Sequence, residues 1–242
     1  MAKTLTLKMS KYIILTVLIN TLFVQKGYSN YKFSFGLRQS YYLISFTDSE
    51  NSTKTSLPGQ SSSGFEFSNL YMASSGIVVG LKGYSEVVRF NNPITGSLDN
   101  SEVELNGINA IISFYKYWLR PELRIGKDSR IYINNDELSI AKIKSVNRTN
   151  LGLFFTPSIT GKKKSGLTAK LDLGYRYFFL ATDEGKSLPS TGEMELGAEL
   201  NYYFSSSSID FRIKNSSYTQ KVDDIDQENK SLQLYLGVSF GN

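Results

Sequence analysis

The chain has 242 residues, a net charge of +5, and neither cysteine nor histidine. The absence of cysteine excludes a disulfide framework and a thiolate metal site, and the absence of histidine excludes a Ser–His hydrolytic site and histidine-ligated metal chemistry. The positive charge is modest and scattered, without a basic patch of interleaved aromatic residues, so we expect no nucleic-acid partner.

Residues 1–29 have the three-part layout of a secretory signal peptide. A basic start is followed by an apolar run over 12–24, and Gly27 and Ser29 place small residues three and one positions before the cut. We predict cleavage near Ser29, which leaves a single mature domain over 30–242. No later stretch is long and apolar enough for a transmembrane helix, so the mature chain could enter lipid only as a closed β-barrel.

Segments in which polar and apolar residues alternate follow one another along the mature chain. A period of two with one apolar face indicates strands that lie between two different environments. We predict ten antiparallel strands, over 31–46, 65–73, 77–90, 103–118, 122–133, 151–160, 166–180, 193–204, 209–220 and 231–241. An even count places both chain ends at the same rim. Eight or twelve strands remain alternatives, because the alternation that begins within 134–149 slips at 142–143.

Long polar connections take turns with short ones. The long ones are 51–64, 91–101, 134–149, 181–192 and 221–230, and the short ones are 74–76, 119–121, 160–165 and 205–208. Outer-membrane barrels have this asymmetry, with long loops outside the cell and short turns in the periplasm. An extracellular partner, if there is one, is expected to meet loops 51–64, 134–149, 181–192 and 221–230.

Aromatic residues gather near the predicted strand ends. Tyr175, Tyr177 and Phe179 mark one rim, and the other rim has Tyr115, Tyr117, Trp118, Tyr202, Tyr203, Phe204 and Phe240. This placement predicts an aromatic girdle at each membrane interface. The segment Met194–Phe204 extends roughly 33 Å, which covers about 25 Å of membrane at a tilt near 45°. The alternative is a secreted soluble β-barrel that binds an apolar ligand, with Leu200, Leu234 and Leu236 inside.

The segment LTAKLDLGYRYFF at 167–179 and the closing alternation resemble the small bacterial outer-membrane β-barrels of the OmpA/OmpX-like type, within the porin-like superfamily. The closing residues are Leu232, Leu234, Leu236, Val238 and Phe240. The resemblance implies an all-β, transmembrane, up-and-down barrel in the bacterial outer membrane, in contact with lipid and lipopolysaccharide. The last strand is similar to the signal that such proteins present to the barrel-assembly machinery, although Gly241 and Asn242 follow its aromatic residue.

The polar faces of the last strands carry charges of both signs. The residues expected in the lumen are Lys170, Asp172, Arg176, Glu195, Glu199, Arg212 and Lys214. We expect Arg176 near Glu195 and Glu199, Lys214 near Glu199, and Arg212 near Asn201. Opposite charges attract strongly in a narrow, dry interior, and a barrel of this size is narrow enough for side chains to fill. The hypothesis is a lumen plugged by side chains, and the alternative is a water-filled lumen with screened charges.

The residues therefore favour a non-enzymatic barrel with long polar surface loops and a structural, envelope-integrity or surface-interaction role. The acidic residues over 223–228 match no calcium-loop spacing, so we expect a solvated loop with no metal, and no cofactor elsewhere. A narrow passive pore for small solutes is the alternative function.

Overall fold

A computed structural model describes residues 31–48, 54–90, 98–99, 102–115, 119–135, 141–159, 166–183, 186–222 and 225–241. The predicted signal peptide and its cleavage site lie outside the described residues. Within these ranges, no helix is long and apolar enough to cross a membrane.

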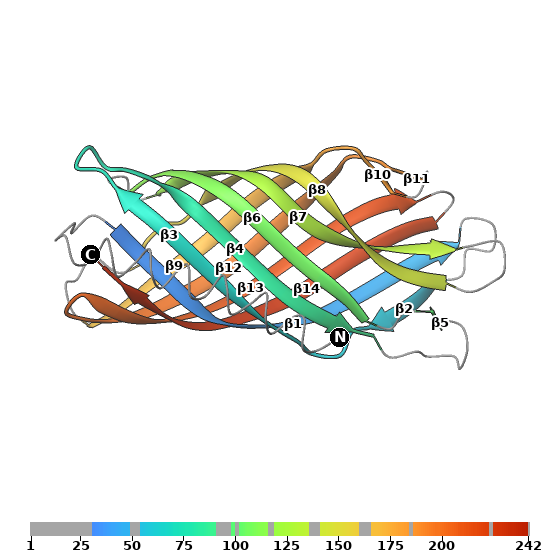
Figure 1. The fold of residues 1–242 in the computed structure, drawn as a ribbon, viewed down its shortest axis with the longest axis horizontal. Helices are drawn as coiled ribbons and strands as arrows, with labels where there is room; N and C mark the ends of the chain where they lie inside the picture. The colour runs from blue at the N-terminus through green and yellow to red at the C-terminus, as the bar shows by residue number, and fades with distance from the viewer. Residues whose placement is uncertain are drawn as a thin grey trace, which may run out of the picture.

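Ten long antiparallel strands close into a barrel (Figure 1). In spatial order each strand pairs with its neighbour, and the last returns to pair with the first. The strands are β1 (Tyr31–Asp48), β3 (Ser62–Met72), β4 (Ile77–Arg89), β6 (Glu102–Phe114), β7 (Pro121–Asn135), β8 (Ala141–Phe155), β9 (Gly166–Phe178), β12 (Thr191–Phe204), β13 (Ser207–Val222) and β14 (Ile225–Phe240). The predicted count of ten is confirmed. Phe33 pairs with Phe240, so both ends of the barrel sequence lie at one rim, as expected.

Four short strands lie at the opposite rim. β2 (Lys54–Pro58) continues the line of β3 along β1, and β5 (Leu98–Asp99) pairs in parallel with β8. β10 (Ala181–Asp183) and β11 (Lys186–Leu188) form a small hairpin of their own in the connection between β9 and β12. We call this rim the loop end, and the rim with Tyr31 and Phe240 the termini end.

The two faces of each strand follow the predicted alternation. On β12, the outward side chains of Met194 and Leu196 are 70% and 57% exposed, whereas Glu193 and Glu195 between them are 3% and 5% exposed. The closing residues of β14 also point outward: Leu236 is 56% and Phe240 49% exposed. The barrel therefore has an apolar outside and a charged inside.

Two rings of outward aromatic residues border this apolar belt. Tyr71, Phe114, Tyr202, Phe204 and Phe240 surround the termini end, and Tyr41, Tyr175, Tyr177 and Phe179 stand toward the loop end. The prediction of two girdles is confirmed, with two corrections: Tyr115 and Tyr203 line the lumen, because they follow the outward Phe114 and Tyr202 and point to the other face. Tyr117 and Trp118 lie outside the described residues.

Exposed apolar side chains over a charged interior are stable where lipid surrounds the barrel. A soluble barrel would need the reverse arrangement. Leu200 is 43% exposed on the outer face and Leu234 and Leu236 share that face, so the alternative of an internal apolar ligand is wrong.

The strands extend further toward the loop end than the sequence predicted. Much of the predicted loops 51–64, 134–149, 181–192 and 221–230 belongs to strands, including the first half of β8 and of β14; residues 51–53, 136–140, 184–185 and 223–224 lie outside the described residues. Beyond the apolar belt the outward positions also become polar, as Asn215 and Thr219 on β13 show. The alternation of polarity then disappears although the hydrogen-bonded ladder continues, and this explains the error.

Candidate functional site

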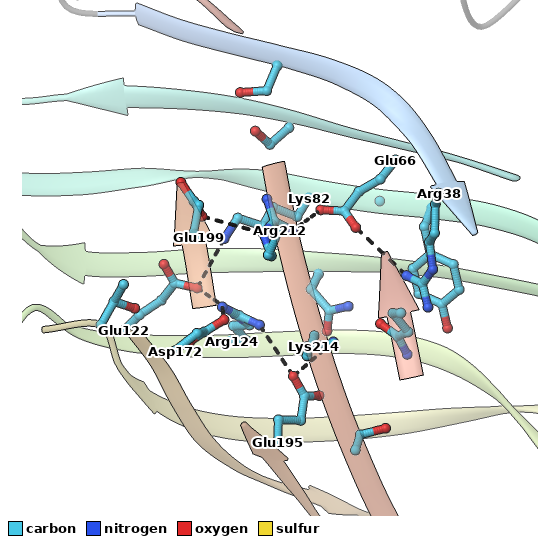
Figure 2. Close-up of a pocket in the computed structure, with 18 of the residues that line it drawn as sticks. Arg38, Glu66, Lys82, Glu122, Arg124, Asp172, Glu195, Glu199, Arg212 and Lys214 are labelled. Atoms are coloured by element: carbon cyan, nitrogen blue, oxygen red, sulfur yellow. Dashed lines mark hydrogen bonds and ion pairs between the residues drawn. The ribbon is translucent and has the colours of Figure 1, made fainter. Parts of the chain in front are cut away.

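The structure places all seven of the predicted lumen residues along a cavity of about 870 Å³ inside the barrel. They come from β9, β12 and β13, which are consecutive in the wall. Their side chains form ion pairs with one another and with residues of the strands opposite (Figure 2). The ion pairs leave the cavity open between them, so side chains alone do not fill the lumen as hypothesised. A barrel of ten strands is wide enough for the charges to pair along the wall and to span only parts of the interior.

Glu195 is the centre of one group of charges. Its carboxylate lies 2.6 Å from the Arg176 guanidinium, 2.9 Å from Lys214 Nζ and 3.9 Å from Arg124 on β7. The side chain is only 2% exposed. A buried carboxylate is tolerable when it is paired and hydrogen bonded, which three surrounding cations achieve here.

A second group forms a chain of charges across the lumen. Glu199 accepts from Lys170 at 3.0 Å and contacts Arg212 at 3.4 Å. Arg212 reaches the Glu66 carboxylate of β3 at 2.6 Å, and Glu66 in turn lies 3.8 Å from Arg38. Figure 2 shows Arg212 between its two acids, which come from separate parts of the wall. The chain ends where Arg38 pairs with the buried Glu86 at 2.9 Å.

Two of the expected pairings are wrong in register. Arg212 lies opposite Glu199, not Asn201, and Lys214 lies opposite Gly197 and bonds Glu195, not Glu199. The predicted turn 205–208 is the reason: β12 ends at Phe204 and β13 begins at Ser207, so the turn is two residues shorter than expected. Turn length sets hairpin register, and a shift of two residues keeps the faces but changes the partners. The expected pair between Arg176 and Glu195 is present.

The earlier strands contribute lumen charges that the sequence analysis did not single out. They are Arg38, Glu66, Lys82, Glu86, Glu122, Arg124, Asp128 and Arg130, and β12 adds Glu193. A signal for most of them was available, because on each strand they share the parity of its polar face. On β7, for example, Glu122, Arg124, Asp128 and Arg130 are all even-numbered and alternate with Leu123 and Ile125.

Inward aromatic rings position three of the lumen arginines. Each ring lies flat over a glycine on a neighbouring strand, where a Cβ would be 2.0 Å from Phe154 at Gly174, 2.4 Å from Tyr84 at Gly107 and 2.7 Å from Tyr235 at Gly36. An arginine stacks on each ring: Arg124 at 3.6 Å, Arg38 at 4.0 Å and Arg212 at 4.7 Å from the respective ring centres. Cation–π contacts of this kind hold the guanidinium groups at the height of their acids.

At the loop end, β7 and β8 leave the wall. The pairing of β6 with β7 stops at Gly107 and Asp128, while β7 and β8 stay paired as far as Asn135 and Ala141. Two serines of the departing hairpin satisfy the freed edge of β6: Ser129 Oγ accepts from the Asn106 amide at 3.0 Å, and Ser145 Oγ donates to the Glu104 carbonyl at 2.9 Å.

This part of β7 and β8, which we call the inner hairpin (residues 129–135 and 141–147), packs inside the mouth of the barrel. One face carries Ile131, Ile133 and Ile143, each 2% exposed or less, in a core with the inner faces of β1, β4 and β6; their partners there are Ile44, Leu57, Val88, Phe90, Val103 and Leu105. The other face places Tyr132 against Leu188 and Val222. The mouth at the loop end is thus filled by a hydrophobic core.

Hydrogen bonds fasten the inner hairpin to β13 and β14. The Ile131 carbonyl accepts from Tyr218 Oη at 3.1 Å, Gln220 Nε2 at 3.0 Å and Gln227 Nε2 at 3.1 Å. Gln227 also accepts from the Ile133 amide at 2.9 Å. These side chains take the place of a neighbouring strand for the buried backbone of β7.

The cavity lies between this closure and the termini end. Ile131 and Tyr218 line its inner limit, and Lys32, Tyr203 and Gly241 line it near the rim where the chain ends meet. The lumen pocket thus extends from the inner hairpin to the termini end.

An apolar belt between aromatic girdles, a charged interior and a closed antiparallel wall define a barrel that spans a membrane. The chain is a transmembrane β-barrel of the outer-membrane type. The predicted resemblance to bacterial outer-membrane barrels is confirmed for the fold.

No protein-family model matches the sequence of this barrel, and no curated protein matches it. Solved structures similar to it include the outer membrane protease OmpT from Escherichia coli, at 11% identity and a TM-score of 0.47 over 87% of this chain and 96% of that one. Another is the β domain of the Bordetella autotransporter BrkA, at 10% identity and a TM-score of 0.44 over 86% of this chain and 100% of that one. The outer membrane protein OprG from Pseudomonas aeruginosa matches at 9% identity and a TM-score of 0.38 over 87% of this chain and 94% of that one. Similarity at this level carries no information about activity.

Proposed function

We propose that this protein is a non-enzymatic barrel of the bacterial outer membrane, closed to through-flow, with a structural or surface-interaction role in the cell envelope. The observation that carries the proposal is the inner hairpin. Solutes crossing the barrel would have to pass through the core around Ile131, Ile133 and Ile143, whose side chains are almost completely buried.

The orientation of the barrel supports a role at the cell surface. The short turn after Phe204 and both ends of the barrel sequence, Tyr31 and Phe240, lie at the termini end, and the long strand extensions lie at the opposite end. In outer-membrane barrels the rim with the short turns faces the periplasm. Outward polar residues there include the pair Arg89 and Glu102, 2.8 Å apart and both exposed. We propose that this extramembrane section, with loops 51–64, 134–149, 181–192 and 221–230, meets lipopolysaccharide and extracellular partners.

The closing strand supports a role in assembly. Leu232, Leu236, Val238 and Phe240 share the outer face of β14 and are exposed to lipid. We propose that this face is what the barrel-assembly machinery meets before β14 pairs with β1.

The lumen chemistry supports a role without catalysis. The chain has no histidine or cysteine to act as base or nucleophile. The buried carboxylates that would have to serve instead, such as Glu86 and Glu195, are already held by arginines. Of the acidic residues in the predicted loop 221–230, Asp226 and Glu228 lie along β14 and belong to no metal-binding group among the described residues. Asp223 and Asp224 are outside the described residues.

The test is conductance in planar lipid bilayers, with the mature chain refolded in detergent and a heat-dependent shift on SDS gels as the check of folding. One variant replaces residues 132–144 with an Asn-Gly turn, which removes the part of the inner hairpin that fills the mouth. A control variant replaces only 136–140 with Gly-Ser residues.

We expect no steady conductance from the wild type or the control and stepwise conductance from the variant without the hairpin. Steady conductance by the wild type, equal to that of the shortened variant, would show a passive pore and overturn the proposal.

A further inference from the structure

We propose that the lumen pocket binds a small oxyanion, a carboxylate or a phosphate, that enters from the termini end. The proposal rests on the closed barrel proposed above, because a pocket with one entrance can retain a solute that an open pore would pass. The cavity volume of about 870 Å³ is within the range of pockets that enclose small molecules.

The ion pairs of the lumen leave positive charge at its entrance. Eight buried or half-buried lumen acids each contact a cation: Glu66, Glu86, Glu122, Asp128, Asp172, Glu193, Glu195 and Glu199. Asp210 accepts instead from the hydroxyls of Ser208 and Ser239. Two cations that line the pocket, Lys32 and Arg120, form no ion pair with an acid in the part of the chain that the structure describes.

These two cations gather with a third near Glu199. Lys32 lies 5.9 Å from the ring centre of Tyr203, which faces the same pocket as Glu199 on β12. Arg120, immediately before β7, lines the same pocket as Lys170. Glu199 is already shared between Lys170 and Arg212. The entrance has the cations Lys32, Arg120 and Lys170 and the acids Glu199 and Asp210, so positive charge is in excess and a bound anion would relieve the repulsion.

A polar group without a partner lies beside this cluster. Thr168 is one pleat from Lys170, lines the pocket and is only 5% exposed, yet its hydroxyl has no hydrogen-bond partner among the described residues. Buried hydroxyls normally have one, and a carboxylate or phosphate oxygen in the pocket would accept its proton. Lys32, Arg120, Lys170, Thr168 and Tyr203 together offer the donors that an oxyanion needs.

The ligand chemistry follows from these donors. The unpaired positive charges at the entrance repel cations and attract anions. The low-dielectric wall of the barrel strengthens their electric field inside the pocket, which increases this preference for anions. Two probes distinguish the two kinds of oxyanion: citrate for carboxylates and inorganic phosphate for phosphates. Spermidine serves as the cationic comparison.

The experiment is titration calorimetry of the refolded barrel in detergent at low ionic strength. The double variant K32Q/R120Q removes the unpaired charges, and K127Q removes an exposed lysine on the outer face of β7 as the matched control. We expect saturable binding of at least one anion, weakened tenfold or more in the double variant, unchanged in K127Q and weakened by added salt.

A second readout does not depend on the double variant. The chain has no cysteine, so K32C and T219C each carry a single thiol, at the pocket entrance and on the outer face of β13. The bound anion should slow labelling of K32C with a thiol reagent and leave T219C unaffected. The proposal is overturned by the absence of saturable anion binding, by equal binding in the double variant, or by spermidine binding as well as the anions do.

The two proposals fail separately. A wild-type barrel that conducts would refute the closure and would not change the calorimetric result in detergent. A wild-type barrel that does not conduct and binds none of the anions would refute the proposed anion binding and would leave the proposed closure in place.

Discussion

Phe154 on β8 lies directly over Gly174 on β9, so that a methyl group at Gly174 would sit 2.0 Å from the Phe154 ring. Arg124 stacks on the ring 3.6 Å from its centre, and Arg124 contacts both Glu122 and Glu195. The glycine thus lets an aromatic ring lie flat on the barrel wall, and the ring supports a charge of the lumen.

Because the ring has no room to move toward the wall, we expect Gly174→Ala to destabilise the barrel by about 1–3 kcal/mol through overpacking. In the background of Phe154→Ala the same change should cost much less, because the clash is gone. Urea unfolding of the two single variants and the double variant measures this coupling. Equal costs of Gly174→Ala in both backgrounds would mean that the ring does not depend on the glycine.

Glu195→Gln should be among the most damaging single changes in the lumen. It leaves Arg176 and Lys214 buried without their carboxylate, and breaking a buried pair in this way costs about 3–5 kcal/mol. The matched control is Glu228→Gln on β14, whose partner Lys230 is 2.8 Å away and 53% exposed, so the control should cost no more than about 1 kcal/mol. Urea unfolding in the same detergent compares them, and similar losses for both variants would contradict the central role of Glu195.

Gln227→Leu should loosen the inner hairpin without removing its hydrophobic core. The change leaves the buried Ile133 amide without an acceptor, a loss of about 1–3 kcal/mol, or roughly five- to 150-fold faster exchange of that amide. Hydrogen exchange followed by mass spectrometry over 131–135 measures this. Gln233→Leu, on the same strand and also facing the lumen, should leave the exchange of 131–135 unchanged. If Gln227→Leu has no effect there, Tyr218 and Gln220 hold the hairpin alone.

Single cysteines test the orientation of the barrel in cells. Ser74→Cys lies in the exposed turn between β3 and β4 at the termini end, and Thr219→Cys lies on the outer face of β13 toward the loop end. A membrane-impermeant maleimide should label Thr219→Cys on intact cells, and it should label Ser74→Cys after the outer membrane is permeabilised. The reverse labelling pattern would show that the barrel has the opposite orientation, with the entrance of the lumen pocket outside the cell.

Part of the lumen was predictable from parity alone. On β9, β12 and β13 the charged residues alternate with apolar ones, so Lys170, Glu195 and Arg212 could be assigned to the inner face before any contact was known. Their partners were less accessible. A turn shorter by two residues moved Arg212 opposite Glu199, and the partner that it reaches across the lumen, Glu66, is 146 residues away in sequence.

The sequence by itself determined the apolar belt and its aromatic borders and favoured ten strands over eight or twelve, because alternation reports the environment of each face of a strand and is a local property. Only the tertiary structure decided that β7 and β8 turn into the mouth. In the inner hairpin the side chains meet protein on both faces: Ile131 and Ile133 meet one core, and Tyr132 between them meets another. A segment buried on both sides loses its alternation, and its destination depends on partners from β1, β4, β6, β13 and β14 that only the closed barrel brings together.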